Sequence, residues 1–365
     1  MINLHFFPSR PIAWYLARTF FVRAIAVLAS LVFLLMILDL LGESGRILAQ
    51  PGNGEEQLWR YVSLRIPQLI QQFAPFAILL GTLITFATMN QHSEIIAMKA
   101  AGISAHQIIA PLMLTSLVFA GFLFVFNERF ATRATAALNA WEDVGYGAVP
   151  PETGTKTNVW IRAGDDLIFA RQVMGSGRDT RLSGVRIFDR DGTTLVGITE
   201  AESGRYARPG WELANVRRFD VNNGLVSRAP SLKIGDDILP IQFTLASVDP
   251  DEQDFWMLRR SIDELERAGR SIRSAEANWW HKISGPLSGV LMPLLAAIAA
   301  FGLARSGQLF MRAVVGMGLG FSYFVADNFA LALGNFGAYP PFLAAWGPFF
   351  LFLLIGETVL VRTEE

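Results

Sequence analysis

The chain has 365 residues, of which 52% are hydrophobic and only 17% charged, and its net charge at pH 7 is −1. Soluble domains carry about 25% charged residues, so this deficit indicates that lipid is part of the solvent. The balanced charge gives no support for nucleic-acid binding, which needs a concentrated basic surface. The lack of cysteine excludes disulfides, thiol catalysis and cysteine-based metal sites.

Six apolar segments are long enough to cross a bilayer, which takes about 20 mostly apolar residues. Three lie in the first part of the chain and three in the last: Ala24–Leu41, Val62–Met89, Ile108–Phe126, Ile283–Leu303, Ala313–Leu333 and Phe342–Val361. The first follows an arginine-bearing stretch without a small-residue cleavage site, so we expect a retained helix rather than a signal peptide.

Basic residues in the short loops predict the orientation. They are more frequent on the side of the two termini: Arg10, Arg18, Arg23, Lys99, Arg305, Arg312 and Arg362, against Arg46, Arg60 and Arg65 on the other side. Since cytoplasmic loops carry the excess of Lys and Arg, we expect both termini in the cytoplasm and the long middle segment outside.

The middle segment, residues 131–254, has the pattern of an all-β domain. Short apolar or alternating runs suggest strands at Val159–Arg162, Leu167–Val173, Val185–Phe188, Leu195–Thr199, Trp211–Val216, Arg218–Val221 and Ile238–Leu245. Gly, Asn and Asp turn signals separate them, which favours a sandwich or jelly roll over alternating strands and helices.

The period changes again after this domain. Leu258, Ile262, Leu265 and Ile272 share one helical stripe, which predicts an amphipathic linker helix over residues 255–277. The predicted order is therefore three spans in 1–130, the β domain in 131–254, the linker, and three spans in 278–365.

No catalytic or cofactor motif is present. The chain lacks both the phosphate-binding loop of P-loop ATPases and the Gly-x-Ser-x-Gly nucleophile elbow. Its four histidines lack metal-ligand spacing. We therefore predict a non-enzyme without cofactor or metal.

The loop between the second and third spans predicts a short helix at about residues 93–102. Ser93 suits its start, Glu94 suits the positive end of its dipole, Gly102 suits a left-handed stop and Ser104 suits the start of the next span. Two interpretations stay open here: a plain connection lying at the lipid surface, or a helix that docks in a groove of a soluble partner.

Ionisable residues within or near the spans are Asp39, Asp327 and Glu357. A charge at the bilayer centre costs at least about 2.5–3.5 kcal/mol, so such residues are candidates for function. Asp39 and Glu357 are near span ends and can reach water. Asp327, deep in the fifth span, is either functional or a polar contact inside the bundle. Their scatter argues against a membrane enzyme acting on lipid.

Three arginines lie at the expected outer ends of spans: Arg46, Arg129 and Arg133. The guanidinium fork matches phosphate geometry, but arginine is also a common interfacial anchor. Both interpretations stay open.

Several stretches resemble the inner-membrane permeases of lipopolysaccharide export, the LptF/LptG family, and look closer to the G-type than to the F-type subunit. They are Gln72–Phe76, Ser93–Gly102, Leu182–Phe188, Asn278–Ile283 with Pro286–Ser288, Arg312–Gly316 and Gly320–Asp327. The resemblance implies a permease of the Gram-negative inner membrane with a periplasmic jelly roll. Its partners would be an F-type subunit, a cytoplasmic ATPase dimer, periplasmic jelly-roll bridge proteins and lipopolysaccharide.

The resemblance also implies roles for individual residues. Glu94, Ile95, Met98 and Gly102 would belong to a coupling helix in an ATPase groove. The first and fifth spans would be lateral gates of a lipid cavity, with acyl-chain or gate candidates Phe73, Phe76, Phe321, Phe324 and Asp327. Arg46, Arg129 and Arg133 would be candidates for glycolipid phosphates.

One stretch departs from the family. Its enterobacterial members carry lysines near the outer end of the first span, whereas the matching residues 35–44 contain no base. A second hypothesis is a membrane-anchored scaffold whose outer domain binds periplasmic proteins or glycan without transport. It explains the β domain and leaves the short loop helix unexplained.

Overall fold

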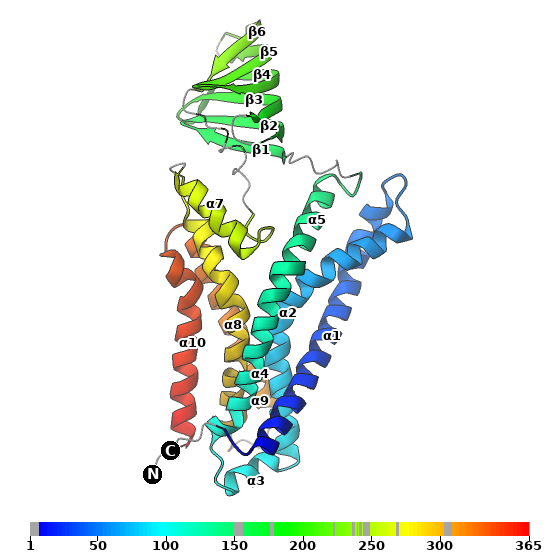
Figure 1. Cartoon of the computed structure of the whole chain (residues 1–365), viewed down its shortest axis with the longest axis vertical. Helices are drawn as coiled ribbons and strands as arrows, with labels where there is room; N and C mark the ends of the chain where they lie inside the picture. The colour runs from blue at the N-terminus through cyan, green and yellow to red at the C-terminus, as the bar shows by residue number, and fades with distance from the viewer. Residues whose placement is uncertain are drawn as a thin grey trace. The chain divides into compact units, whose positions relative to one another are not determined.

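The computed structural model describes residues 7–148, 156–175, 179–221, 223–235, 238, 240, 243, 249–267, 270–302 and 309–364. The chain forms two compact units. One contains the helices, and the other is built on a β-sheet inserted between them (Figure 1).

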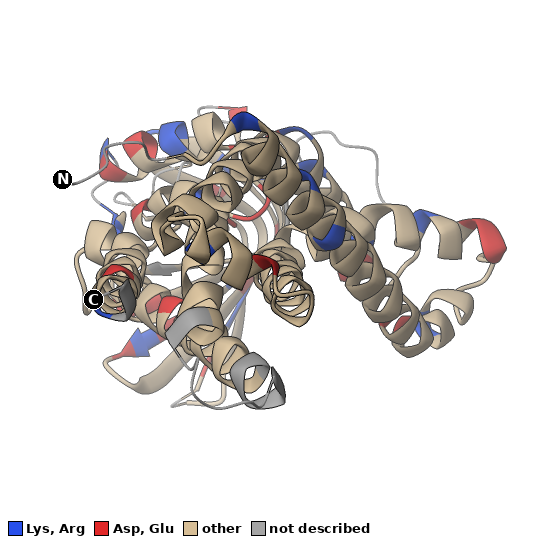
Figure 2. Cartoon of the chain, turned by 90° about the horizontal axis from the view of Figure 1, so that it is seen from below, with Lys and Arg blue, Asp and Glu red and all other residues tan. Residues whose placement is uncertain are grey.

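Six described helices are long and apolar enough to cross a membrane, which confirms the six predicted spans. They lie within α1 (Arg10–Leu48), α2 (Glu55–Gln91), α4 (Ala105–Phe126) with its continuation, α8 (Arg273–Gly302), α9 (Leu309–Asn335) and α10 (Pro341–Glu364). Charged residues are sparse along these helices, which are mostly tan in Figure 2. The short α3 (Glu94–Ala100) lies at the end of the bundle where α1 begins and α10 ends (Figure 1).

The third span is longer than its hydropathy indicated. After α4, the π-helix η1 (Asn127–Ala131) and then α5 (Thr132–Asp143) continue the helical run. A π turn leaves backbone groups out of the usual ladder, and the Thr132 hydroxyl donates to the carbonyl of Asn127, 3.2 Å away. The range 131–254 expected for the β domain therefore begins with helical residues.

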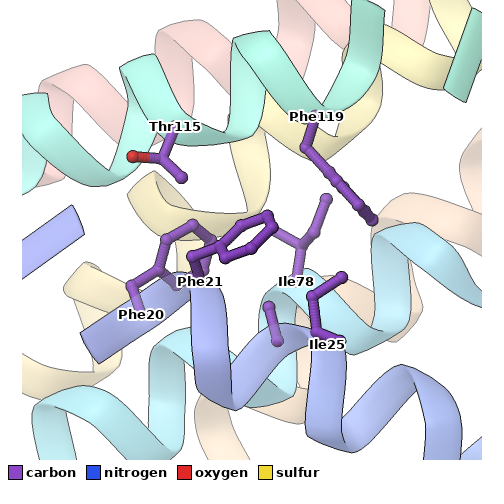
Figure 3. Close-up of a pocket in the computed structure, with 7 residues that line it drawn as sticks. Phe20, Phe21, Ile25, Ile78, Thr115 and Phe119 are labelled. Carbon is purple, nitrogen blue, oxygen red and sulfur yellow. The ribbon is translucent and has the colours of Figure 1, made fainter. Parts of the chain in front are cut away.

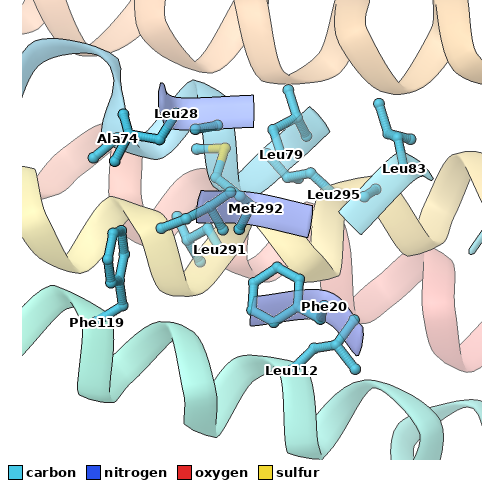
Figure 4. Close-up of a cluster of buried hydrophobic side chains, with 14 of the residues drawn as sticks. Phe20, Leu28, Ala74, Leu79, Leu83, Leu112, Phe119, Leu291, Met292 and Leu295 are labelled. Atoms are coloured by element: carbon cyan, nitrogen blue, oxygen red, sulfur yellow. The ribbon is translucent and has the colours of Figure 1, made fainter. Parts of the chain in front are cut away.

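The core of the helical unit lies around α8. From Leu291 to Ala297 every residue of this helix is buried, and the short side chains of its alanines let neighbouring helices approach. Figure 4 shows Met292 and Leu295 among side chains of α1, α2 and α4: Phe20, Leu28, Ala74, Leu79, Leu83, Leu112 and Phe119.

The inserted sheet has six antiparallel strands in sequential order. They are β1 (Lys156–Ala163), β2 (Asp166–Met174), β3 (Arg181–Asp191), β4 (Thr194–Ala207), β5 (Gly210–Asp220) and β6 (Val226–Ile234). The fold is thus a helical membrane protein with an inserted β domain, as predicted, and its described strands form a meander.

Three details of the strand prediction differ from the structure. The runs Trp211–Val216 and Arg218–Val221 belong to one strand, β5, up to Asp220. Strand β6 was missed because it is a largely exposed edge strand with Pro230 and no clean alternation. The run Ile238–Leu245 lies mostly outside the described residues, and Pro240 and Phe243 within it are helical rather than extended.

One face of the sheet forms the core of the β domain, with Trp211 at its centre. The Trp211 side chain is 1% exposed, and its Nε1 donates to the carbonyl of Ile238 at 2.8 Å. The rings of Tyr206 and Phe243 meet it edge-on, an arrangement that favours aromatic pairs.

The predicted linker helix is shorter than residues 255–277. Helix α7 covers Phe255–Arg267, and α8 begins at Arg273, so Ile272 lies between the two helices. The other stripe residues, Leu258, Ile262 and Leu265, are buried as the amphipathic pattern predicted.

Candidate functional site

The short helix α3 has a buried and an exposed side. Ile95 is 3% exposed and Met98 packs against the helical core, whereas Ile96 is 65% exposed. Gly102 has φ +82°, the left-handed stop that the sequence indicated. Ser93 has φ 59° and makes no side-chain cap, so its predicted capping role is wrong.

The next helix begins as predicted. The Ser104 hydroxyl accepts from the Gln107 backbone N–H at 3.2 Å, and the Gln107 side chain accepts from the Ser104 N–H at 3.1 Å. This reciprocal pair is a capping box, which fixes the point where α4 starts. Helix α3 is therefore preceded by a residue in the left-handed conformation, Ser93, and followed by the capped start of α4 at Ser104.

Glu94 is tied to α1. The Tyr15 hydroxyl lies 2.9 Å from Oε2 and 3.2 Å from Oε1 of Glu94. This single donor therefore contacts both oxygens of a carboxylate that is 79 residues away in the sequence. Hydrogen bonds to an ionised group are stronger than neutral ones. This contact joins the candidate docking helix to the first span, and the local sequence contained no signal for it.

A narrow apolar seam attaches the first span to the bundle. Every fourth residue of α1 is buried: Leu16, Phe20, Ala24, Leu28, Val32 and Met36. In the middle of this seam Gly81 of α2 lies against Ala24, so close that a Cβ on Gly81 would be 2.7 Å from the Ala24 Cα. The remaining faces of α1 are largely exposed, as lipid or another chain would require.

Polar contacts hold the other end of α1. Asp39 accepts from Arg65 Nε at 2.9 Å, from Arg65 Nη2 at 3.3 Å and from the Tyr61 hydroxyl at 2.7 Å. Both side chains of this ion pair are only about a third or less exposed, at 26% and 32%. The sequence alone suggested that Asp39 reaches water, and its partners on α2 were missed.

Glu43, one turn further, extends this group. It accepts from the Tyr146 hydroxyl at 2.8 Å and forms an ion pair with Arg46 at 3.0 Å. Burial and then the hydrogen bond to Glu43 raise the pKa of Tyr146, which therefore stays a donor at neutral pH. Asp39, Glu43, Tyr61, Arg65 and Tyr146 thus form one polar cluster. Arg46 takes part in it through Glu43.

A small apolar hollow lies between α1, α2 and α4 (Figure 3). Its lining comes from α1 (Phe20, Phe21, Ala24, Ile25), α2 (Ile78) and α4 (Thr115, Phe119). Its volume of about 10 Å³ is at the lower limit of what could hold one water molecule. The hollow shows that α1 and α4 meet through apolar side chains.

The predicted acyl-contact phenylalanines fall into two groups. Phe76 of α2 and Phe324 of α9 stack with ring centroids 3.8 Å apart, and Phe73 lies 6.2 Å from Phe76. Phe321 is not part of this stack and is 62% exposed. The structure therefore brings three of the four together and leaves the fourth on the open face of α9.

Asp327 forms a pair inside the bundle. Its Oδ2 lies 3.0 Å from His281 Nε2, which joins α9 to α8, and its side chain is 10% exposed. This is the polar contact that the sequence left open as an alternative. A second His–carboxylate pair, His106 with Glu357 at 3.3 Å, joins α4 to α10 and is more exposed, at 38% and 43%. Within the described chain no three acidic, His or Cys side chains gather as a metal site.

Arg129 and Arg133 lie one turn apart on η1 and α5, and both side chains are exposed. Neither has an ion-pair partner within the part of the chain that the structure describes. Between them in sequence, Ala131 and Thr132 are buried, so the two guanidinium groups belong to one face of the helical run. Two free neighbouring cations can bind an anionic group together.

The family model described as lipopolysaccharide export system permease LptF/LptG matches residues 14–362, nearly the whole chain. The chain belongs to the LptF/LptG permease family. It is 26% identical over 358 residues to the lipopolysaccharide export system permease protein LptG of Escherichia coli strain K12, covering 95% of this chain and 97% of that protein. It is also 26% identical over 368 residues to LptG of Haemophilus influenzae, covering 96% and 98%.

This membership confirms the resemblance seen in the sequence, including its leaning toward the G type. The relatives are named as permease proteins, which is a non-enzyme role. Together with six apolar helices, they fit a multi-pass LptF/LptG protein of the inner membrane.

Proposed function

We propose that this chain is the G-type permease subunit of an ABC-type transporter that extracts lipopolysaccharide from the inner membrane. In this proposal it pairs with an F-type subunit, docks on a cytoplasmic ATPase dimer and passes lipid to periplasmic jelly-roll bridge proteins. The family supports the cargo, and the two-sided helix α3 is the observation that best supports force coming from a partner.

Helix α3 has the features of a docking element. Ile95 and Met98 anchor it to the bundle, while Ile96 is free to enter an apolar groove. Glu94 lies at its first turn with its carboxylate bonded to the Tyr15 hydroxyl, and Gly102 lets the chain turn back into α4. A docked helix that is anchored on its other side transmits movement instead of rolling on the surface.

The open faces of α1 and α9 support a cavity shared with a second subunit. On α9 the exposed apolar side chains recur at helical spacing: Val314, Met317, Phe321, Val325 and Phe329. Acyl chains would lie against this face and against Phe73, Phe76 and Phe324. Arg129 and Arg133 would bind glycolipid phosphate, whereas Arg46 is engaged by Glu43 and is the weaker candidate.

The orientation follows from the docking role. If α3 meets an ATPase, the end of the bundle where α1 begins and α10 ends is cytoplasmic. The β domain is then periplasmic, as the basic residues of the short loops also predict. We propose the predicted division into spans (1–130), β domain (131–254), linker (255–277) and spans (278–365), with one change: the helical residues 131–143 continue the third span.

The test of docking is Glu94→Lys. We expect the variant to fold normally and to lose co-purification with a Walker-motif ATPase in mild detergent. The reversed charge would lie in a partner groove that accepts the negative charge of Glu94. Glu56→Lys is the matched control: it makes the same change in the first turn of α2, on an exposed side chain. Unchanged ATPase recovery with Glu94→Lys would argue against docking through α3.

The test of cargo and direction is photo-crosslinking from the β domain. A photoreactive residue placed on its buried face should form lipopolysaccharide adducts only when ATP is present. Adducts that form equally without ATP, or none at all, would favour the scaffold hypothesis over transport.

A further inference from the structure

Helix α1 connects the two ends of the membrane-spanning unit in one rigid piece. It runs without a break from Arg10 to Leu48, and its only proline, Pro11, is in the first turn, where it does not disturb the ladder. Movement imposed at one end of such a helix must reappear at the other. The contacts of α1 with α2 and α3 determine how such movement is transmitted.

Three contacts of α1 can transmit movement, one near each end and one between them. Near the inner end is the Tyr15–Glu94 hydrogen bond. Between them, Ala24 lies against the backbone of Gly81, where a Cβ would be only 2.7 Å from the Ala24 Cα. Near the outer end is the pair Asp39–Arg65. A helix whose backbone meets a neighbouring helix at one point, and which has polar ties near both ends, can rock about that point while the rest of its apolar seam slides.

The spacing sets the size of the effect. At 1.5 Å per residue, Tyr15 lies roughly 14 Å from Ala24, and Asp39 roughly 22 Å on the other side. A shift of about 2 Å at Tyr15 would thus become about 3 Å at Asp39. That exceeds what a hydrogen bond tolerates, so the ties of Asp39 to Arg65 and Tyr61 would break.

We propose that Tyr15 is a positioning residue that couples the docking helix to the first span, through its hydrogen bond to Glu94 and rocking of α1 about Ala24 and Gly81. This inference rests on the proposed function. Tyr15 touches neither lipid nor nucleotide in this role. It makes movement of α3 open the outer end of α1, where lipid would enter or leave.

The decisive variant is Tyr15→Phe, which keeps the ring and removes only the hydroxyl. The unchanged chain is measured beside it. Trp14→Phe is the matched control on the adjacent exposed position. All are made in the full complex, reconstituted in liposomes that contain lipopolysaccharide.

Two quantities are measured besides ATPase recovery: ATP-dependent lipopolysaccharide release, and the distance between spin labels on cysteines placed at Leu41 of α1 and Phe130 of η1. Both sites are exposed, and the chain has no cysteine of its own. We expect Tyr15→Phe to retain ATPase recovery within twofold, to lower release at least fivefold, and to abolish the nucleotide-dependent distance change. Trp14→Phe should match the wild type.

Wild-type release and distance changes in Tyr15→Phe would overturn the inference. So would loss of ATPase binding in that variant, since Tyr15 would then belong to the docking surface itself. Failure of the proposed function appears elsewhere: the wild-type complex would show no ATPase or no release, and the inference would fall with it.

Discussion

The contact between Gly81 and Ala24 makes a quantitative prediction about how the first span is held. In Gly81→Ala, the new Cβ would lie 2.7 Å from Cα, 2.8 Å from N and 3.0 Å from Cβ of Ala24. Carbon atoms pack best at about 3.5–4.0 Å, so α1 and α2 must separate by about 1 Å. The obstacle is backbone, which no change of rotamer can relieve.

Overpacking of this kind costs about 1–3 kcal/mol, with the upper part expected where backbone is involved. Alanine gains about 1 kcal/mol over glycine in a helix, which offsets part of this. We therefore expect Gly81→Ala to be less stable than wild type by about 1–2 kcal/mol.

Gly121→Ala in α4 is the matched control, because nothing lies within 4 Å of its new Cβ. It should equal or exceed the wild type in stability. Unfolding in mixed micelles with increasing SDS gives the free energies. Equal stability of Gly81→Ala and Gly121→Ala would refute the close approach of α1 and α2.

Three further predictions concern single contacts. Asp39→Asn should lower the free energy of unfolding in the same assay by about 1–2 kcal/mol, since it weakens charged hydrogen bonds to Arg65; no change would mean that the pair is not formed. Trp211→Phe should loosen the β-sheet by about 1–3 kcal/mol, because the buried Ile238 carbonyl loses its donor; unchanged hydrogen exchange of β5 would contradict this. Burial raises the pKa of Asp189 despite the nearby Arg218, so the folded protein binds a proton at Asp189 more readily than the unfolded chain does. The opening free energy of β3, measured by hydrogen exchange, should therefore fall as the pH rises above about 4. Asp189→Asn should remove that fall.

The sequence predicted those elements whose residue pattern is set by their surroundings, namely the spans in lipid and the strands with one buried face. The six spans were found because a helix in lipid must be apolar over its whole length, a signal that no packing detail can hide. Strands β1 to β5 were found from alternation and turn glycines. Strand β6 was missed because an edge strand exposed on both faces has no apolar alternation to detect.

The site was predictable only where its signal is local. The left-handed Gly102 and the Ser104 cap follow from neighbouring residues, and the structure shows both. The partners of Glu94 and Asp39 do not follow from neighbours. They depend on how α1 is rotated and shifted against α2 and α3, which the contact at Gly81 fixes and no local pattern encodes.

The distribution of contacts along α1 has a consequence for how such a span can change position. Its apolar seam is non-directional, so Leu28 or Val32 can slide by an ångström with little change in buried area. Its polar ties at Tyr15 and Asp39 are directional and break over the same distance. Substitutions in the seam should therefore change stability, while substitutions at the ties should change when the helix moves. In the proposed transport, the first span must stay in the bundle and also open, which requires these two kinds of contact to be separate, as they are in α1.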